Sequence, residues 1–200
     1  FIGAIIDQIK ALGINMVALN PPVCEFGLAA VNFDLPGTDG RRHTLADCRG
    51  PNGLLVMFIC NHCPFVKAVI DRIVRDCHEL AALGVGSVAI MSNDVAVYPE
   101  DSFENMALLA QRLDFPFPYL HDETQSVARA YGAVCTPDFF GYNNRMELQY
   151  RGRLDASGRN PAPPDAPREL FAAMRLIAET GLGPREQTAS IGCSIKWRGA

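Results

Sequence analysis

The feature that most constrains the fold of this chain is an unbroken apolar run at residues 54–59 that ends at a pair of cysteines. Cys60 and Cys63 follow it directly, and Pro64 comes next. Six consecutive apolar residues are typical of a central strand that is covered on both faces. After Pro64, apolar side chains recur at helical spacing as far as position 83, and a proline is tolerated in the first helical turn because its missing N–H needs no partner there. The sequence therefore predicts a buried strand, a turn that holds both cysteines, and a helix over residues 64–83.

Two thiols at this spacing and at a helix N-terminus form a candidate redox pair. The unpaired N–H groups and the dipole of the helix stabilise a thiolate, so the pKa of a Cys-x-x-Cys cysteine falls from about 8.5 to roughly 3.5–7.5. Asn61 and His62 stand between the cysteines, and a charge or hydrogen-bond donor on His62 would favour the thiolate and make the disulfide more oxidising. A structural zinc site needs a second pair of ligands, which the other cysteines do not form, so no metal is predicted. These cysteines are Cys24, Cys48, Cys77, Cys135 and Cys193.

Length and composition fit one globular domain. The chain has 200 residues, of which 48% are apolar and 20% charged, and both values are ordinary. A net charge of −4 gives no electrostatic footprint for nucleic acid or an anionic membrane, and no stretch approaches the roughly 20 apolar residues of a membrane span. Seven cysteines favour reduced thiols in a reducing compartment. We predict a cytoplasmic protein, with a lost leader left open because the chain begins with Phe1.

Three segments are expected along the chain. Residues 1–30 form a preface, and the apolar stripe of a helix at 2–12 either packs on the domain or contacts a second copy in a homodimer. Residues 31–181 form the domain, and residues 182–200 form a tail packed on it. Within the domain the patterns predict a hairpin at 31–45, a helical turn at 44–47, strands at 54–59, 85–91, 117–120, 136–142 and 147–151, helices at 64–83, 99–113, 122–131 and 168–181, and a loop at 155–167.

This order of elements resembles the thioredoxin fold, an α/β architecture in which helices flank a central mixed sheet. The N-terminal hairpin and the strand–helix insertion at 115–131 resemble the subgroup shared by peroxiredoxins and TlpA/ResA-type thiol-disulfide oxidoreductases, within the AhpC/TSA (redoxin) superfamily. The resemblance covers residues 31–180. The segments CNHCPF at 60–65 and IGCSIKW at 191–197 also resemble an uncharacterised thioredoxin-like branch of that superfamily.

The resemblance implies a thiol-disulfide oxidoreductase without a cofactor. Cys60 matches the exposed attacking cysteine, Cys63 the buried resolving one, and Pro137 the cis-proline that faces the disulfide, with a trans proline at a strand start as the alternative. A cis-proline would leave the backbone of Thr136 free to bind an extended substrate segment. Cys60 would attack a disulfide in a protein or small-thiol partner, and Cys63 would resolve the mixed disulfide. The direction of exchange and the upstream reductant or oxidant stay open, and Asp138 either tunes the pair or faces solvent.

The chain departs from the family pattern around the cysteines. The strand at 54–59 carries no carboxylate to assist the buried cysteine, so the proton acceptor is open between His62, water and a carboxylate from another loop. Cys135, two residues before the proline, is a candidate third redox thiol or a small core residue. Cys24 and Cys193, near the two ends, are candidates for a contact or a disulfide between preface and tail.

Two other functions use the same residues. The nucleophile of a peroxiredoxin follows the pattern Pro-x-x-x-Thr-x-x-Cys, and alignment of Cys63 with that pattern puts Val56 at the proline, which weakens the hypothesis of a thiol peroxidase. A carrier of Cu(I) or zinc would use the soft thiolates together with His62. In that case His43 or His121 would have to serve as the distant ligand.

Overall fold

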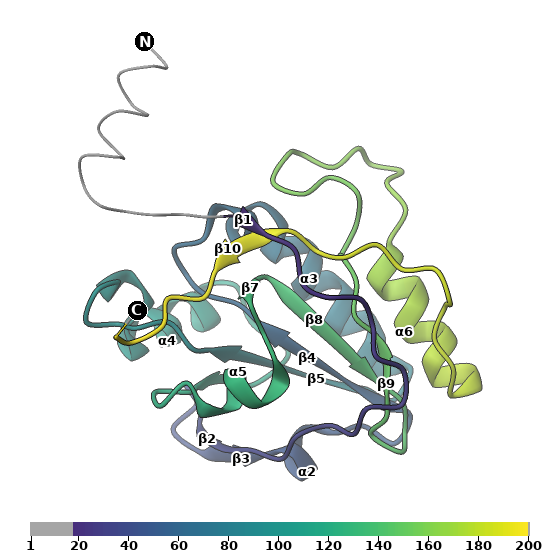
Figure 1. The fold of residues 1–200 in the computed structure, drawn as a ribbon, viewed down its shortest axis with the longest axis horizontal. Coiled ribbons are helices and arrows are strands. Elements are labelled where there is room, and N and C mark those ends of the chain that lie inside the picture. Colours follow the sequence, from purple (N-terminus) through teal and green to yellow (C-terminus); the bar gives the residue numbers. More distant parts are fainter. Residues whose placement is uncertain (1–17, 200) are drawn as a thin grey trace.

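A five-stranded mixed sheet forms the centre of the molecule in the computed structural model, which describes residues 18–199. The strand order is β6-β5-β4-β8-β9, with β4, β5 and β6 parallel, β8 antiparallel to β4, and β9 antiparallel to β8. Figure 1 shows this sheet with helices around it, as predicted. Its strands are β4 (Gly53–Phe58), β5 (Val85–Met91), β6 (Tyr119–His121), β8 (Asp138–Tyr142) and β9 (Leu148–Tyr150).

The central strand β4 is buried along its whole length because it supplies both halves of the core. Met57 points into a cluster with α3 (Pro64–Ala82) and α6 (Glu169–Thr180), whereas Phe58 points into a second cluster with α5 (Ser126–Tyr131). Successive side chains of a strand face opposite sides of the sheet, so an unbroken apolar run satisfies both clusters. The predicted central strand is confirmed, and it delivers the chain to the cysteines.

The predicted hairpin is present and carries a short helix. β2 (Asp34–Pro36) pairs antiparallel with β3 (Arg42–Thr44), and α2 (Leu45–Cys48) follows at once. The hydroxyl of Thr44 accepts the N–H of Asp47, and the Asp47 carboxylate accepts the N–H of Thr44. This reciprocal capping box satisfies two donors that the start of a helix otherwise leaves unpaired.

The segment after β5 differs from the single helix predicted at 99–113. It divides into a 3₁₀ turn at Pro99–Asp101 and the helix α4 (Phe103–Arg112). Ser102 separates them because its backbone is extended and its hydroxyl caps the first turn of α4. The brief helix predicted to follow a cap at 122–124 and to end at Tyr131 is present as α5 (Ser126–Tyr131). The division after Asp101 turns that carboxylate toward the cysteine-bearing turn, as described below.

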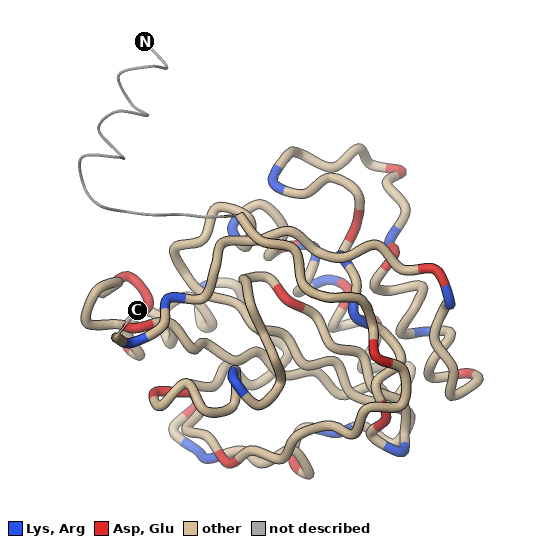
Figure 2. Tube along the Cα trace, viewed as in Figure 1, with Lys and Arg blue, Asp and Glu red and all other residues tan. Residues whose placement is uncertain are grey.

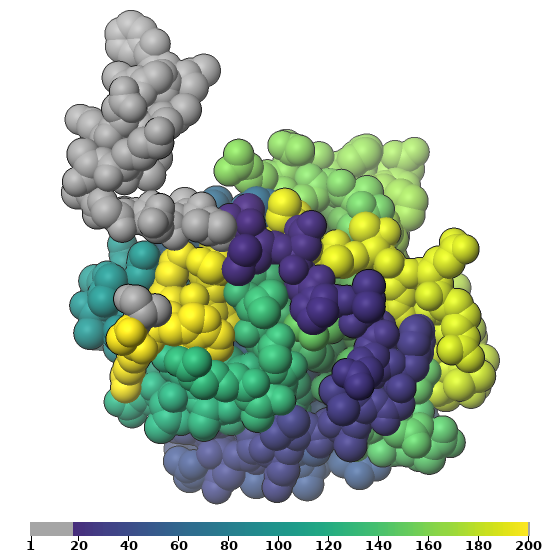
Figure 3. Space-filling model, viewed as in Figure 1, coloured from purple at the N-terminus to yellow at the C-terminus, as the bar shows by residue number. Residues whose placement is uncertain are grey.

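The tail pairs with the body through a separate three-stranded sheet. β10 (Gly192–Ser194) lies between β1 (Ala18–Leu19) and β7 (Cys135–Thr136), and it is antiparallel to both. Cys193 stands opposite Thr136 in this register. Figure 3 shows the yellow tail and the purple preface side by side over the green residues around β7. Both ends of the described chain therefore meet at the segment that precedes Pro137.

Charged residues are distributed over the whole fold. Figure 2 shows Lys and Arg interspersed with Asp and Glu along the trace. Within residues 18–199, no helix has both the length and the apolar character that a membrane span requires. The helix predicted at 2–12 and its dimer contact lie outside the described residues.

Candidate active site

Both cysteines of the pair lie where β4 passes into α3. Cys63 is the N-cap residue of α3, and a backbone hydrogen bond from Val66 reaches its sulfur. The turn and helix therefore form as predicted. Cys60, however, is only 1% exposed, so the expectation of an exposed cysteine is wrong. Its Sγ lies 3.4 Å from Thr136 Oγ1 and 3.8 Å from His62 Nδ1, and these side chains help to cover it.

The segment at Pro137 faces the cysteines, but its backbone edge is occupied. The Thr136–Pro137 bond is cis, as predicted, and Cys63 Sγ donates to the Thr136 carbonyl at 3.1 Å. Thr136 is paired with Cys193 of β10, so the expectation of a free substrate-binding edge is wrong. The tail approaches this closely because Gly192 has no side chain, and a Cβ there would collide with the Thr136 carbonyl.

Substitution of Gly192 by alanine is expected to detach β10 from β7. Overpacking by one methyl group costs about 1–3 kcal/mol, which raises the population of the detached tail roughly tenfold or more. Alkylation of Cys193 by iodoacetamide under native conditions should accelerate by the same factor. Ile191→Ala is the control because that neighbouring side chain is 43% exposed. Equal alkylation rates in wild type and Gly192→Ala would contradict the close approach.

A buried carboxylate, that of Asp101, organises the turn between the cysteines. Asp101 Oδ2 lies 2.6 Å from His62 Nδ1 and accepts from Asn93 Nδ2 at 2.8 Å. Its Oδ1 accepts the backbone N–H groups of Asn61 and His62 at 2.8 and 3.2 Å. The sequence left open a carboxylate from another loop as the proton acceptor, but it predicted that Asp101 lies inside the helix at 99–113. The structure shows that it binds His62, which in turn lies beside Cys60.

The two residues between the cysteines are held from several sides. The ring of His62 stacks on Tyr98 with centroids 4.9 Å apart and an interplanar angle of 12°. The side chain of Asn61 accepts from the Tyr119 hydroxyl at 3.0 Å and donates to the Glu100 carbonyl at 3.0 Å. These contacts fix the turn relative to β6 and the 3₁₀ turn. The tuning role of Asn61 and His62 stays a prediction.

Three thiols, rather than two, meet at the N-terminus of α3. Cys193 Sγ lies 2.9 Å from Cys63 Sγ. The side chain of Cys60, in the turn between β4 and α3, is also hydrogen-bonded to Cys63. The hydrogen bond from Cys193, followed by that from Cys60, lowers the pKa of Cys63. Burial, followed by the hydrogen bond to Cys63, raises the pKa of Cys60. Cys63 is therefore the more easily deprotonated thiol of the pair.

The other two thiols singled out from the sequence lie in different settings. Cys135 is buried in β7, its Sγ donates to the Pro137 carbonyl at 3.5 Å, and burial raises the pKa of this thiol. No disulfide joins Cys24 to Cys193 in the described part of the chain. Preface and tail are instead tied by strand pairing. The third thiol in contact with Cys63 is Cys193, whose position depends on the pairing of β10 with β7.

Comparison with known proteins identifies the family of this chain. The AhpC/TSA family model matches residues 26–155. The chain belongs to the AhpC/TSA family. An uncharacterised conserved protein from Geobacillus kaustophilus is 44% identical over 94% of this chain and 100% of its own, with a TM-score of 0.87. A hypothetical protein from Sinorhizobium meliloti is 37% identical over 90% of this chain and 99% of its own, with a TM-score of 0.84.

A more distant likeness confirms the fold of this AhpC/TSA protein. A thiol:disulfide interchange protein of the thioredoxin family from Chlorobium tepidum is 18% identical, with a TM-score of 0.56 over 78% of this chain and 97% of its own. At this identity the likeness concerns architecture alone. The predicted thioredoxin-like α/β fold is therefore confirmed, together with the predicted superfamily. No match was found among the curated proteins.

Asp138, directly after the cis-proline, is part of a buried ion pair. It is fully buried, which overturns the alternative that it faces solvent. Arg151 Nη2 donates to its carboxylate at 3.0 Å. Burial nevertheless raises the pKa of Asp138 to about 6, against the opposing effect of Arg151. This ion pair ties the start of β8, directly after Pro137, to the residue that follows β9.

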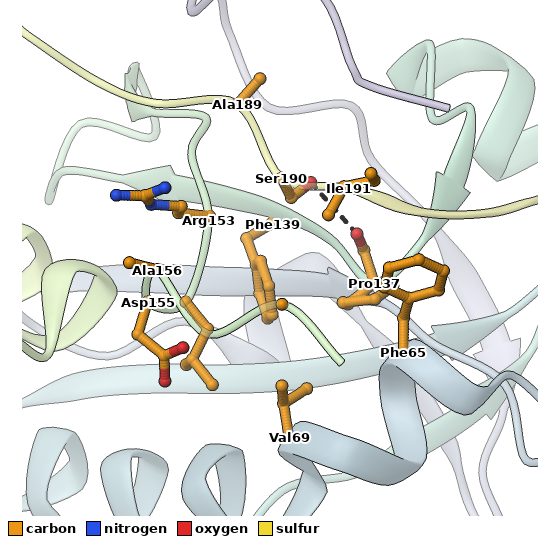
Figure 4. A pocket seen from close by; sticks show the side chains of 12 residues that line it. Phe65, Val69, Pro137, Phe139, Arg153, Asp155, Ala156, Ala189, Ser190 and Ile191 are labelled. Atoms are coloured by element: carbon orange, nitrogen blue, oxygen red, sulfur yellow. Dashed lines mark hydrogen bonds between the residues drawn. The ribbon is translucent and has the colours of Figure 1, made fainter. Parts of the chain in front are cut away.

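Two pockets of the AhpC/TSA protein flank the thiol cluster. One, shown in Figure 4, lies beside Pro137, and there the Ser190 hydroxyl donates to the Pro137 carbonyl at 3.1 Å. Phe65, Val69, Phe139 and Ile191 give this pocket apolar walls. Cys60 lines the other pocket, between α3 and α4. Its remaining walls come from Asn61, Val66, Lys67, Ile70, Leu109, Arg112 and Leu113.

One group of potential metal ligands includes two residues of the turn between β4 and α3. Single ligand atoms of Cys60, His62 and Asp101 all lie within 4.8 Å of one another. Thiolate, imidazole and carboxylate are all ligands that zinc accepts. His43 and His121, the distant ligands considered for a copper carrier, are not members of this group among the described residues.

Proposed function

We propose that this AhpC/TSA protein is a thiol-disulfide oxidoreductase that exchanges disulfides through Cys60 and Cys63. The observation that carries the proposal is the contact of both sulfurs at the N-terminus of α3, opposite the cis Thr136–Pro137 bond. A helix N-terminus stabilises a thiolate, and a thiolate is the species that attacks a disulfide. The thioredoxin-like fold of the family supports the same chemistry.

In the proposed reaction Cys60, which lines the pocket between α3 and α4, makes the first attack. Because this residue is only 1% exposed, the partner has to displace side chains that cover its sulfur. Cys63 is enclosed by Cys60, Cys193 and the Thr136 carbonyl. The Cys60 proton passes to Cys63, and the Cys60 thiolate attacks one sulfur of the partner disulfide, so the other sulfur leaves as a thiolate. Cys63 then gives its proton to the first partner thiolate, which its lowered pKa favours, attacks the Cys60 sulfur and releases the second partner thiolate. The partner gains two electrons, and a Cys60–Cys63 disulfide remains. The reverse sequence is chemically equivalent.

The partner in this proposal is a disulfide-bearing protein or a small thiol, and the covered edge at Thr136 favours the latter. A small disulfide needs to reach only Cys60, and Lys67 and Arg112 in the wall of that pocket would suit an anionic molecule. A reducing, cytoplasmic compartment fits the seven free thiols of the chain.

The test is capture of a mixed disulfide by Cys63→Ser. With the resolving sulfur removed, the variant should retain the partner covalently on Cys60 when it is treated with oxidised glutathione, as intact-protein and peptide masses would show. Cys135→Ser, which changes a buried thiol of β7, should release the partner as the wild type does. If Cys60 stays free in a folded Cys63→Ser protein, the assignment of the nucleophile is wrong. Consumption of hydrogen peroxide faster than disulfide exchange would favour the peroxidase alternative instead.

A further inference from the structure

The third thiol of the cluster, Cys193, contacts the second cysteine of the proposed redox pair. Cys193 is 2% exposed, and its Sγ is 2.9 Å from that of Cys63. Cys63 thus contacts Cys60 through the turn and Cys193 through the tail. Thiol–disulfide exchange requires a thiol in contact with one sulfur of a disulfide. A Cys60–Cys63 disulfide would present Cys63 to Cys193 in this way.

The tail holds Cys193 in place from both sides. Before it, the Ser190 hydroxyl donates to the Pro137 carbonyl at 3.1 Å. After it, the backbone N–H of Lys196 donates to the buried side chain of Asn93 at 2.9 Å. Between these anchors β10 pairs with β7. The placement of Cys193 therefore follows from several independent contacts rather than from a chance approach of one side chain.

We propose that Cys193 is a third redox-active thiol, which accepts the disulfide from Cys60 by attack on Cys63. The step rests on the proposed function for its supply of the Cys60–Cys63 disulfide. The Cys193 thiolate attacks Cys63 Sγ, the Cys63–Cys193 bond forms, and the Cys60–Cys63 bond breaks. The electron pair of the broken bond leaves with Cys60, which takes up the proton that Cys193 gave up. One disulfide replaces another, so no further oxidant or reductant enters.

The charges around Cys193 favour this step after oxidation of the pair rather than before it. In the reduced cluster the hydrogen bond to Cys63 is the largest cause that raises the pKa of Cys193. A disulfide-bonded Cys63 carries no negative charge, so that cause disappears when the pair is oxidised. The positive charge of Lys196, which lowers the pKa of Cys193, remains. Cys193 thus becomes easier to deprotonate when Cys63 becomes a target for attack.

The rearrangement would return Cys60 to the thiol form and join β10 covalently to the start of α3. Oxidising equivalents would then be stored in a bond that is enclosed by the tail. Cys60, which lines a pocket, would be available for a second partner. The site would thereby hold an oxidised state and a usable nucleophile at the same time.

The test uses Cys60→Ser in the full chain, treated with oxidised glutathione, alkylated and digested without reduction. In this variant Cys63 loses the cover of the Cys60 sulfur, so prolonged incubation should attach glutathione to it at the slow, uncatalysed rate. Cys193 should then displace that glutathione, so a Cys63–Cys193 peptide should become the main oxidised species. Cys60→Ser/Cys135→Ser should give the same bridge, whereas Cys60→Ser/Cys193→Ser should keep glutathione on Cys63. Persistent glutathione on Cys63 in the single variant, or a Cys63–Cys135 bridge, would overturn the proposal.

A measurement on the wild type checks the same inference without any substitution. After partial oxidation, a fraction of molecules should carry the Cys63–Cys193 bridge together with an alkylated Cys60. Complete absence of this species, with Cys60–Cys63 fully formed, would also overturn the proposal. If oxidation of the wild type never yields a Cys60–Cys63 disulfide while Cys60→Ser still yields the Cys63–Cys193 bridge, the proposed function is wrong. The redox activity of Cys193 toward Cys63 is supported in that case.

Discussion

Cys60→Ser is expected to reduce catalysed disulfide exchange to the uncatalysed rate. A serine hydroxyl is not ionised at neutral pH and cannot form the mixed disulfide, and the sulfur that lines the pocket between α3 and α4 is lost. The measurement is turnover of a fluorescent glutathione disulfide in the presence of an excess of small-thiol reductant.

The control for this loss is Cys77→Ser. Cys77 is also buried and belongs to α3, but burial raises the pKa of its thiol. The control should keep the wild-type rate. Substantial exchange by Cys60→Ser would mean that Cys63 and Cys193 suffice for turnover, and Cys60 would lose its assigned role.

Asp101→Ala is expected to destabilise the protein by about 3–5 kcal/mol, because its buried carboxylate is the acceptor for several charge-assisted hydrogen bonds. The substitution leaves the N–H groups of Asn61 and His62, the His62 ring and the Asn93 amide without their acceptor. Urea unfolding of the reduced protein measures the loss. Glu100→Ala, a change at the exposed neighbouring position, should stay within about 0.5 kcal/mol of wild type.

A second readout separates the electrostatic role of Asp101 from its structural role. Its negative charge is among the causes that raise the pKa of Cys60. Asp101→Asn retains an acceptor oxygen but removes the charge, so it should lose less stability than Asp101→Ala. The reduction potential of the Cys60–Cys63 pair should nevertheless differ from wild type. A wild-type potential in Asp101→Asn, together with a loss below about 1 kcal/mol in Asp101→Ala, would contradict the assignment.

The sequence was sufficient for those parts of the site that depend on local pattern. The apolar run at 54–59 predicts a buried strand because both of its faces must be covered, and Pro64 marks the helix that starts at the second cysteine. The cis-proline followed from the family resemblance. In each case the decisive residues are neighbours in the chain, so their spacing carries the information.

The remainder of the site depends on residues that meet only in the folded protein. Asp101 lies about 40 positions after the turn that it binds, and the acidic residues near it match the first turn of an ordinary helix. Cys193 reaches Cys63 over 130 positions through the pairing of β10 with β7. The sequence holds one indication of that pairing, Gly192, whose missing side chain permits the close approach to the Thr136 carbonyl. Its meaning depends on knowing which backbone lies opposite.

The strand that covers Thr136 sets a concentration threshold for partners. Because β10 belongs to the same chain as β7, it competes for that edge at an effective concentration on the order of millimolar. A peptide that binds the edge with the same intrinsic affinity would have to reach a comparable concentration to displace half of the tails. A small disulfide that approaches Cys60 through the pocket between α3 and α4 meets no such competitor. Under the proposed function, partner choice would be tied to abundance, and abundant low-molecular-weight disulfides would hold the advantage over scarce protein disulfides.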